Sequence, residues 1–174
     1  LYDLYTKAQT PFKWHKKLFD YAKKKKILCF STPFDETSVD LLESLNCPFY
    51  KIASFEMTDI PLIKEIAKTK KPVIISTGLA SLKEIEYSIK SAKEYGIKDI
   101  IVLYCVSSYP AKLEDFNLNN IDILKKKFNC IVGFSDHSTD NKVAEAAVAM
   151  GAEIIEKHIG LENQKDGFDI KFSL

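Results

Sequence analysis

Short apolar runs alternate along the chain with longer segments in which apolar residues recur at helical spacing. The runs are Ile27–Phe30, Phe49–Ala53, Val73–Ser76, Ile100–Cys105, Cys130–Phe134 and Glu153–Glu156. Their length and their content of β-branched and aromatic residues predict buried strands. The intervening segments, together with one that precedes the first run, are Pro11–Lys24, Asp35–Leu45, Ile60–Lys68, Leu82–Tyr95, Ile121–Phe128 and Asn141–Met150. Their spacing predicts helices, as where Ile85, Ile89 and Ala92 fall on one helical face.

Two of these helices have candidate capping residues at their starts. Ser81 stands three positions before Glu84, which is the spacing of a capping box. Ser138 or Thr139 would cap the last helix. These signals support the predicted order of strands and helices.

The alternation of strand and helix predicts a parallel sheet covered by helices. The predicted units recur about every 25 residues, as expected for a (β/α)8 barrel of roughly 200–250 residues. We therefore predict an α/β fold, a TIM (β/α)8 barrel, here a partial barrel of about six units. Residues 1–174 would be the central and C-terminal part of one truncated catalytic domain, with two units before Leu1. An open doubly wound sheet is the alternative, but no glycine-rich fingerprint follows the first run.

The composition is that of a globular protein, and it reduces the number of partner classes to consider. The chain is 46% hydrophobic and 28% charged, with a net charge of +1, so neither nucleic acid nor a membrane surface is an expected partner. No apolar run has the ~20 residues of a membrane span, and the four cysteines form no C-x-x-C pair, so we expect a reducing cytoplasm. All 25 basic residues are lysines. An anion would therefore be held by lysine, hydroxyls, backbone N–H groups or a metal.

Every predicted strand is followed by polar residues. They are Ser31 and Thr32; Lys51, Ser54 and Glu56; Ser76 and Thr77; Ser107, Ser108 and Tyr109; Ser135, Asp136 and His137; and Glu156, Lys157 and His158. The active site of a (β/α)8 barrel lies at this end of the strands. A sheet built only for stability would not need polar residues at all six ends, so the pattern predicts a functional site.

His137 and His158 are candidate metal ligands because each closes a polar triplet after an apolar run. Imidazole combined with oxygen ligands suits Mn²⁺, Zn²⁺ or Co²⁺. Two histidines without a third protein ligand leave positions for water and substrate, as in catalytic sites. The alternative is a pair of hydrogen-bonded histidines without metal. Glu156 could bind the metal, lie beside it or accept a hydrogen bond from a substrate hydroxyl.

Lys51 lies in a predicted strand, where a buried ammonium requires an anionic partner. It could bind a phosphate or carboxylate as a point charge, or form a Schiff base as in metal-independent aldolases. Glu56 in the next loop could be an acid or base, or a solvent-exposed carboxylate. Asp169, in the polar turn Asp166–Asp169, could bind substrate hydroxyls or only shape the turn.

These motifs resemble those of the sialic acid synthase family. The matching strings are Phe30–Phe34, Tyr50–Glu56, Ile75–Gly78, Ser107–Pro110, Gly133–His137 and Ile155–His158, in the same order along the chain. The beginning, Leu1–His15, and the ending, Asp166–Leu174, are most similar to the pseudaminic acid synthase branch. The N-acetylneuraminate and legionaminate branches usually have Gly-Pro-Asp at that ending and Asn in place of Ser107.

The resemblance implies condensation of phosphoenolpyruvate with the open-chain aldehyde of an N-acetylated amino sugar. The sugar would be 2,4-diacetamido-2,4,6-trideoxy-L-altrose, and the products pseudaminic acid and phosphate. The first alternative is synthesis of N-acetylneuraminate or legionaminate. A metal-dependent or Schiff-base-dependent aldolase is the second alternative, and a non-catalytic interaction module is the third.

The resemblance also implies a role for each candidate residue. His137 and His158 would bind Mn²⁺, with Mg²⁺ or Co²⁺ as other candidates, while Glu56 and Glu156 would be catalytic. Asp169 would contact the sugar. The residues implied for phosphoenolpyruvate are Thr32, Lys51, Ser54, Ser76, Ser107, Tyr109 and Ser135.

Further parts of the site are implied outside this chain. They are a second phosphate-binding lysine and a sugar-binding glutamate on two earlier strands, and a C-terminal antifreeze-like domain. That domain would be swapped across a homodimer and deliver an arginine to the partner's site. We therefore expect the 174-residue chain alone to be an unclosed, inactive barrel.

Overall fold

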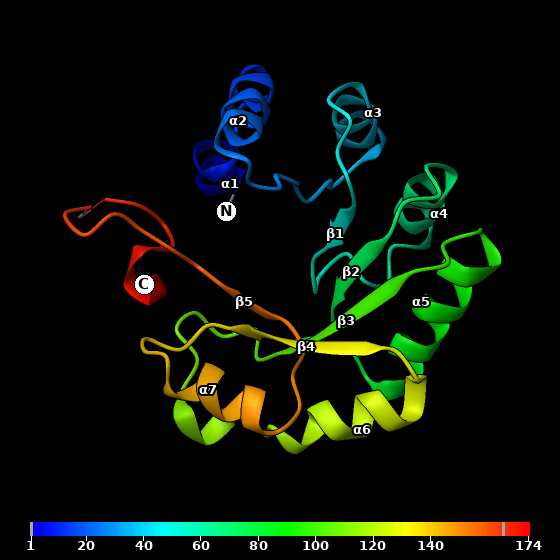
Figure 1. Cartoon of the computed structure of the whole chain (residues 1–174), viewed down its shortest axis with the longest axis vertical. Helices are drawn as coiled ribbons and strands as arrows, with labels where there is room; N and C mark the ends of the chain where they lie inside the picture. The colour runs from blue at the N-terminus through cyan, green and yellow to red at the C-terminus, as the bar shows by residue number, and fades with distance from the viewer. Residues whose placement is uncertain (1, 165) are drawn as a thin grey trace.

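A computed structural model describes residues 2–164 and 166–174 of the chain (Figure 1). Its strands form one parallel sheet in chain order, β1 (Tyr50–Ile52), β2 (Val73–Ser76), β3 (Ile100–Cys105), β4 (Ile131–Asp136) and β5 (Ile155–Lys157). Its α-helices are α1 (Tyr2–Ala8), α2 (Phe12–Lys25), α3 (Glu36–Ser44), α4 (Ile60–Lys68), α5 (Leu82–Glu94), α6 (Asn119–Phe128) and α7 (Lys142–Ala149). Two short 3₁₀ helices, η1 (Leu113–Asp115) and η2 (Ile170–Phe172), complete the described elements.

The sheet curves, and helices α3 to α7 follow one another around its convex side (Figure 1). All four strand pairs are parallel, and each pairing joins strands that are consecutive in the chain. Consecutive parallel strands joined by outer helices are the arrangement of a (β/α)8 barrel. The predicted partial barrel is thus confirmed, with its concave side open (Figure 1).

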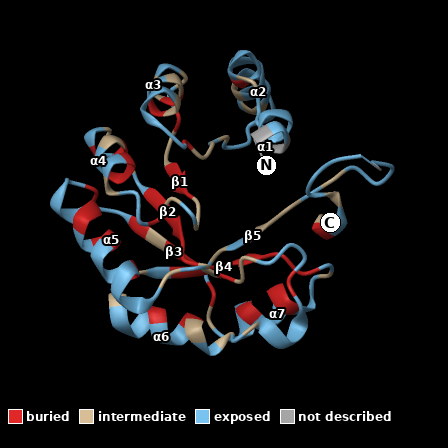
Figure 2. Ribbon diagram, turned by 180° about the vertical axis from the view of Figure 1, so that it is seen from behind, coloured by how far each residue is buried: buried red, intermediate tan, exposed pale blue. Residues whose placement is uncertain are grey.

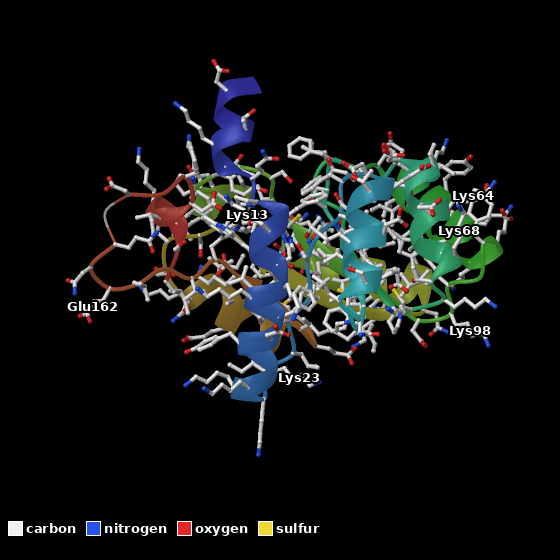
Figure 3. All side chains as sticks on the ribbon, turned by 90° about the horizontal axis from the view of Figure 1, so that it is seen from above. Lys13, Lys23, Lys64, Lys68, Lys98 and Glu162 are labelled. Carbon is white, nitrogen blue, oxygen red and sulfur yellow. The ribbon has the colours of Figure 1, made fainter. Side chains whose placement is uncertain are left out.

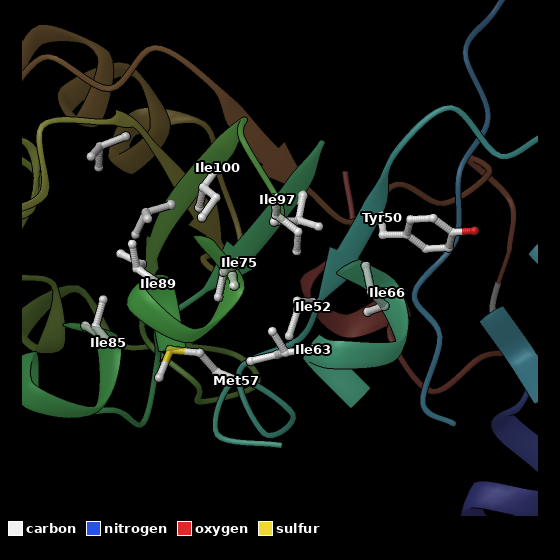
Figure 4. Close-up of a cluster of buried hydrophobic side chains, with 14 of the residues drawn as sticks. Tyr50, Ile52, Met57, Ile63, Ile66, Ile75, Ile85, Ile89, Ile97 and Ile100 are labelled. Atoms are coloured by element: carbon white, nitrogen blue, oxygen red, sulfur yellow. The ribbon is translucent and has the colours of Figure 1, made fainter. Parts of the chain in front are cut away.

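The core lies between the convex side of the sheet and the helices, where buried residues line both (Figure 2). Ile52 and Ile75 of the sheet are at most 1% exposed, as are Ile63 and Ile66 of α4, and these side chains gather in one cluster (Figure 4). Each fully buried side chain of this size contributes roughly 1.5–3 kcal/mol through removal of apolar surface from water. Helix α4 is therefore held to the sheet by its apolar face, as its spacing predicts.

The prediction of a sixth strand at Ile27–Phe30 was wrong. This segment is an extended connection between α2 and α3, with Ile27 65% and Leu28 75% exposed. A strand needs a hydrogen-bonded neighbour, and β1 pairs with β2 rather than with this segment. The Phe30 ring packs on Phe49 with 4.3 Å between centroids. This side-chain contact, and not a strand pairing, holds the segment against the rest of the fold.

The predicted helix starts were correct at one helix and wrong at another. Ser81 and Glu84 form the reciprocal bonds of a capping box at α5. The last helix starts after Asn141 without a side-chain cap, and the Ser138 N–H donates to Asp136 instead. Short helices α1, η1 and η2 were not predicted, because each is too short to show a periodic pattern.

Lysines on the outer surface are solvated, as labelled examples on α2, α4 and the loop before β3 illustrate (Figure 3). Lys23, Lys64 and Lys98 are all exposed. By contrast, Lys51 is only 7% exposed, which sets it apart from surface lysines.

None of the described helices has the length and apolar content needed to cross a membrane. All four cysteines are free.

Candidate functional site at the strand ends

A cavity of about 710 Å³ opens at the C-terminal ends of the strands. Ten predicted site residues line it: Thr32, Lys51, Ser54, Ser76, Tyr109, Ser135, His137, Glu156, His158 and Asp169. The predicted residues Glu56 and Ser107 are not among its lining. Sequence reasoning missed Gln9, Thr10 and Cys105, which also line the cavity. The first two follow a helix with no sequence signal, and Cys105 reads from sequence as an ordinary apolar strand residue.

Side-chain alternation selects which strand residues enter the cavity. Lys51 lines it, while its neighbours Tyr50 and Ile52 belong to the apolar core. Ser135 and Glu156 are register partners on β4 and β5, so they enter side by side. The Ser135 hydroxyl donates to Glu156 Oε1 at 2.7 Å.

Lys51 and Glu156 form an ion pair within the cavity, with Nζ 3.4 Å from Oε1. The Lys51 side chain is 8% exposed and that of Glu156 35%. Glu156 therefore compensates the buried ammonium in part, and Lys51 retains donors for a further anion, since an ammonium has three.

Asp136 and Lys157 form a second ion pair at 2.8 Å, and Lys157 also lines the cavity. Their side chains are 0% and 8% exposed. Lys157 also donates to the Ser138 carbonyl oxygen at 2.8 Å, and the Ser138 N–H donates to Asp136 Oδ1 at 2.8 Å. This pair joins β4 to β5 and fixes the loop after β4, so its role is structural.

His137 is held in one tautomer by its backbone partner. Its Nδ1 lies 2.9 Å from the Val106 carbonyl oxygen, which can only accept, so Nδ1 carries the proton and Nε2 keeps a lone pair. Burial lowers the pKa of His137, and nearby His158 acts in the same direction, against the Val106 hydrogen bond. His137 is therefore a neutral imidazole at neutral pH, which is the form that binds metals.

The two imidazoles face a common space. Their ring centroids lie 5.6 Å apart, and His158 Nδ1 is 3.5 Å from Asp169 Oδ2. Tyr109 packs on His137 with 4.3 Å between ring centroids. Within residues 2–164 and 166–174, no group of three or more His, Cys, Asp or Glu side chains is placed to hold a metal. The prediction that His137 and His158 bind a metal therefore concerns a pair of imidazoles, and it stays a prediction.

The hydroxyls of Ser54 and Ser107 lie close to Gly78, which follows β2, and of these residues Ser54 lines the cavity. The Gly78 N–H donates to Ser54 Oγ at 3.1 Å. A Cβ at Gly78 would lie 2.0 Å from Ser107 Oγ, so this position has no room for a side chain. Among the described residues, Ser76 Oγ and Ser107 Oγ are buried without a hydrogen-bond partner. Buried hydroxyls normally have partners, so these two are available to a ligand.

Glu56 lies in the loop after β1 with its carboxylate turned away from solvent. Its Oε2 is buried and has no partner among the described residues. Burial raises the pKa of Glu56, nearby Asp59 adds to the effect, and Lys51 opposes it. Functional acids and bases often have such perturbed carboxyl groups.

The fold and this site define a (β/α)8-type barrel with a polar site where barrel enzymes have their active sites. The chain belongs to the NeuB family, whose sequence model matches residues 1–174. The resemblance to sialic acid synthases is thereby confirmed.

Individual relatives support the same assignment. The chain is 45% identical to pseudaminic acid synthase of Campylobacter jejuni over 174 residues, 100% of this chain and 51% of that protein. It is 44% identical to N,N'-diacetyllegionaminic acid synthase of the same organism over 170 residues, 97% of this chain and 51% of that protein. The chain thus spans about half the length of the curated relatives it matches, and these identities are too close to separate the two branches.

A solved structure supports the fold directly. The N-acetylneuraminic acid synthetase of Leptospira borgpetersenii, in complex with citrate, superimposes with a TM-score of 0.90 at 38% identity. The match covers 95% of this chain and 58% of that one. The curved five-stranded sheet is therefore shared with a synthetase of this family.

Proposed function

We propose that the chain forms most of the catalytic barrel of a nonulosonic acid synthase. The complete enzyme would condense phosphoenolpyruvate with an N-acetylated amino sugar aldehyde and release phosphate. The observation that carries the proposal is the contact of Lys51 with Glu156, and of Glu156 with Ser135, in the same cavity as His137 and His158. The names of the relatives, synthases of pseudaminic, legionaminic and neuraminic acids, support it.

Phosphoenolpyruvate would bind through Lys51 and the hydroxyls around it. Its phosphate and carboxylate would accept from the Ser76 hydroxyl, which lines the cavity and has no partner among the described residues. Ser107, whose hydroxyl also has no partner among them but lies outside the lining, is proposed as a further donor. Thr32, Ser54, Tyr109 and Ser135 would complete the set. The chain has no arginine, and the cavity is lined by two lysines, Lys51 and Lys157. Lys157 is paired with the buried Asp136, so Lys51 is the ammonium that we propose for the anion.

A divalent ion, Mn²⁺ before Mg²⁺ or Co²⁺, would be held by His137 and His158. The fixed tautomer of His137 fits this, because its Nδ1 proton is committed to Val106, and the contact of Nε2 is a long one, 3.4 Å to Ser135 Oγ, which a metal would replace. Such an ion polarises the aldehyde oxygen of the sugar when bound. Two imidazole ligands would leave coordination positions for that oxygen and for water.

The chain's own residues would then guide the bond changes. With its anionic groups fixed by Lys51, phosphoenolpyruvate forms the new bond from its C3 to the aldehyde carbon, whose oxygen takes a proton. Positive charge develops at C2, where Glu156 and Glu56 are the carboxylates proposed to stabilise it and to accept a proton from the attacking water. The water oxygen bonds to C2, and the proton that it loses balances the one taken by the aldehyde oxygen. The C2–oxygen bond to phosphate then breaks, phosphate leaves with the electron pair of that bond and takes the remaining hydroxyl proton, and C2 becomes a ketone whose oxygen comes from water.

The pseudaminic branch is our choice of product. The sugar would be 2,4-diacetamido-2,4,6-trideoxy-L-altrose, with Asp169 beside its hydroxyls. The N-acetylneuraminate and legionaminate reactions are the alternatives for the same site. We further propose a cytoplasmic enzyme in which residues 1–174 form one truncated part of the barrel domain and a C-terminal domain is swapped within a homodimer.

Phosphate release by the full-length enzyme tests the proposal. The enzyme is supplied with phosphoenolpyruvate and each candidate sugar, with and without Mn²⁺. We expect phosphate only with a sugar and a metal, and fastest with the altrose derivative. Metal-independent turnover with a borohydride-trapped imine at Lys51 would favour a Schiff-base aldolase instead.

A further inference from the structure

Phe172 is a buried residue in an otherwise exposed ending. It is 4% exposed and belongs to the short helix η2, whereas every other described residue from His158 to Leu174 is at least partly exposed. Its ring lies 4.8 Å from that of His158 in an edge arrangement at 79°. It also lies 5.3 Å from the Tyr109 ring. The ending thus buries one side chain, whose ring is closer to His158 than to the other candidate metal ligand, His137, at 6.4 Å between centroids.

Backbone hydrogen bonds hold this ending beside His158. The Leu174 N–H donates to the His158 carbonyl oxygen at 3.0 Å, and the Gly160 N–H donates to the Leu174 carbonyl oxygen at 2.8 Å. The Ser173 hydroxyl donates to the Asp169 carbonyl oxygen at 2.8 Å. The ring of Phe172 is therefore placed by the backbone and does not depend on side-chain packing alone.

His158 needs such support more than His137 does. His137 has a 2.9 Å bond from Nδ1 to a carbonyl oxygen. The corresponding contact of His158, to Asp169 Oδ2, is 3.5 Å, which is long for a hydrogen bond. The His158 side chain is also 34% exposed, so a contact of this length leaves its ring free to turn.

We infer that Phe172 is a positioning residue for His158. Its ring edge packs on the imidazole, restricts rotation of the ring and keeps Nε2 turned to the space shared with His137. This inference rests on the proposed metal site and deepens it, because it assigns the geometry of the second ligand to an aromatic side chain of the ending.

The test compares Phe172→Ala with two other substitutions at this position in the full-length enzyme. Phe172→Tyr keeps the ring, and Phe172→Leu keeps apolar volume without it. Phe168→Ala is the matched control, because Phe168 is an aromatic residue four positions earlier in the same ending and is 53% exposed. The readouts are Mn²⁺ affinity by electron paramagnetic resonance of the free ion and the ¹⁵N chemical shifts of the imidazoles without metal.

We expect Phe172→Ala and Phe172→Leu to weaken Mn²⁺ binding by about tenfold or more, the size seen for residues that orient metal ligands. The ¹⁵N signals of His158 should move toward the average of two tautomers, while those of His137 stay in place. Phe172→Tyr and Phe168→Ala should behave as the unaltered enzyme. Phe172→Leu keeps the test valid if the alanine variant does not fold.

Two results would separate this inference from the proposed function. Unchanged Mn²⁺ affinity and unchanged His158 signals in both ring-less variants would overturn the role of Phe172, whatever the activity. If the unaltered enzyme binds Mn²⁺ with these expected differences but releases no phosphate with any candidate sugar, the positioning role stands and the proposed reaction fails.

Discussion

Lys51 on β1 and Glu156 on β5 meet across the sheet, with Nζ 3.4 Å from Oε1, although these strands are the two edges of a five-stranded sheet. In a flat sheet, four spacings of about 4.8 Å would hold the two strands roughly 19 Å apart. The contact exists because the sheet curves as in a barrel and turns both side chains toward its axis. The curvature therefore assembles a site from residues that are 105 positions apart in the chain.

Replacement of Lys51 by methionine should weaken phosphoenolpyruvate binding. Met keeps much of the apolar stem but removes the charge, and a hydrogen bond to a charged group contributes ~1.5–3 kcal/mol, which corresponds to a loss of about 10- to 100-fold. Calorimetric titration of the full-length enzyme with phosphoenolpyruvate measures the change. Lys71→Met is the control, because Lys71 also pairs with a glutamate, Glu43 at 2.5 Å, but does not line the cavity. Equal affinities for both variants would contradict the role of Lys51.

Lys157→Met should instead destabilise the fold. It leaves the Asp136 carboxylate, whose side chain is 0% exposed, without its cation. Removing one partner of a buried pair costs about 3–5 kcal/mol. The double variant Asp136→Asn with Lys157→Met should lose less than the sum of the two single losses, since no unpaired charge is left. Urea unfolding of the three variants measures this, and strictly additive losses would show that the pair is not coupled.

Glu56→Gln should gain stability and lose activity. Burial raises the pKa of Glu56 above its ordinary value of 4.5. The folded protein thus holds the proton more tightly than the unfolded chain, so stability present below pH 4.5 is lost as pH rises through the higher folded pKa. The glutamine variant does not titrate, so it should match the unaltered protein at acid pH and be the more stable of the two at neutral pH.

The two properties of Glu56→Gln are measured separately. Urea unfolding on both sides of the ordinary carboxyl pKa gives the stability difference, and phosphate release gives the rate. A fall in rate of about 100-fold or more is expected if Glu56 handles a proton or a developing charge. A glutamine variant less stable than the unaltered protein at neutral pH would show that the Glu56 carboxylate is favourably placed in the fold.

Gly78→Ala should disturb side chains beside the cavity, of which Ser54 and Cys105 line it. The new Cβ would lie 2.0 Å from Ser107 Oγ, 2.8 Å from Cys105 Sγ and 3.1 Å from Ser54 Oγ, so these side chains must shift. Overpacking of this kind costs about 1–3 kcal/mol, and phosphoenolpyruvate affinity should fall with it. Adding Ser107→Ala removes the shortest of these contacts and should recover part of the lost stability in thermal unfolding. If the double variant recovers no stability, the contact with Ser107 is not the source of the strain in Gly78→Ala.

Sequence periodicity predicted the sheet, its covering helices and ten of the cavity-lining residues, because polar residues at strand ends are a local signal. It failed at Ile27–Phe30, since an apolar run does not reveal whether a neighbouring strand is present to pair with it. The sequence does not show that Glu56 and Ser107 lie outside the cavity lining, because their placement depends on how the loops after β1 and β3 turn. The support of His158 by Phe172 joins residues from two segments, and no spacing in the sequence indicates it.

The cleavage position in phosphoenolpyruvate tests the central proposal most directly. The full-length enzyme is given phosphoenolpyruvate with ¹⁸O in the oxygen that bridges C2 and phosphorus, together with Mn²⁺ and the amino sugar. Mass spectrometry of both products then locates the label. We predict that the label leaves in inorganic phosphate, formed in equal amount to the keto acid, because the C2–oxygen bond breaks. Label retained in the keto acid, or phosphate formed without sugar, would contradict the account.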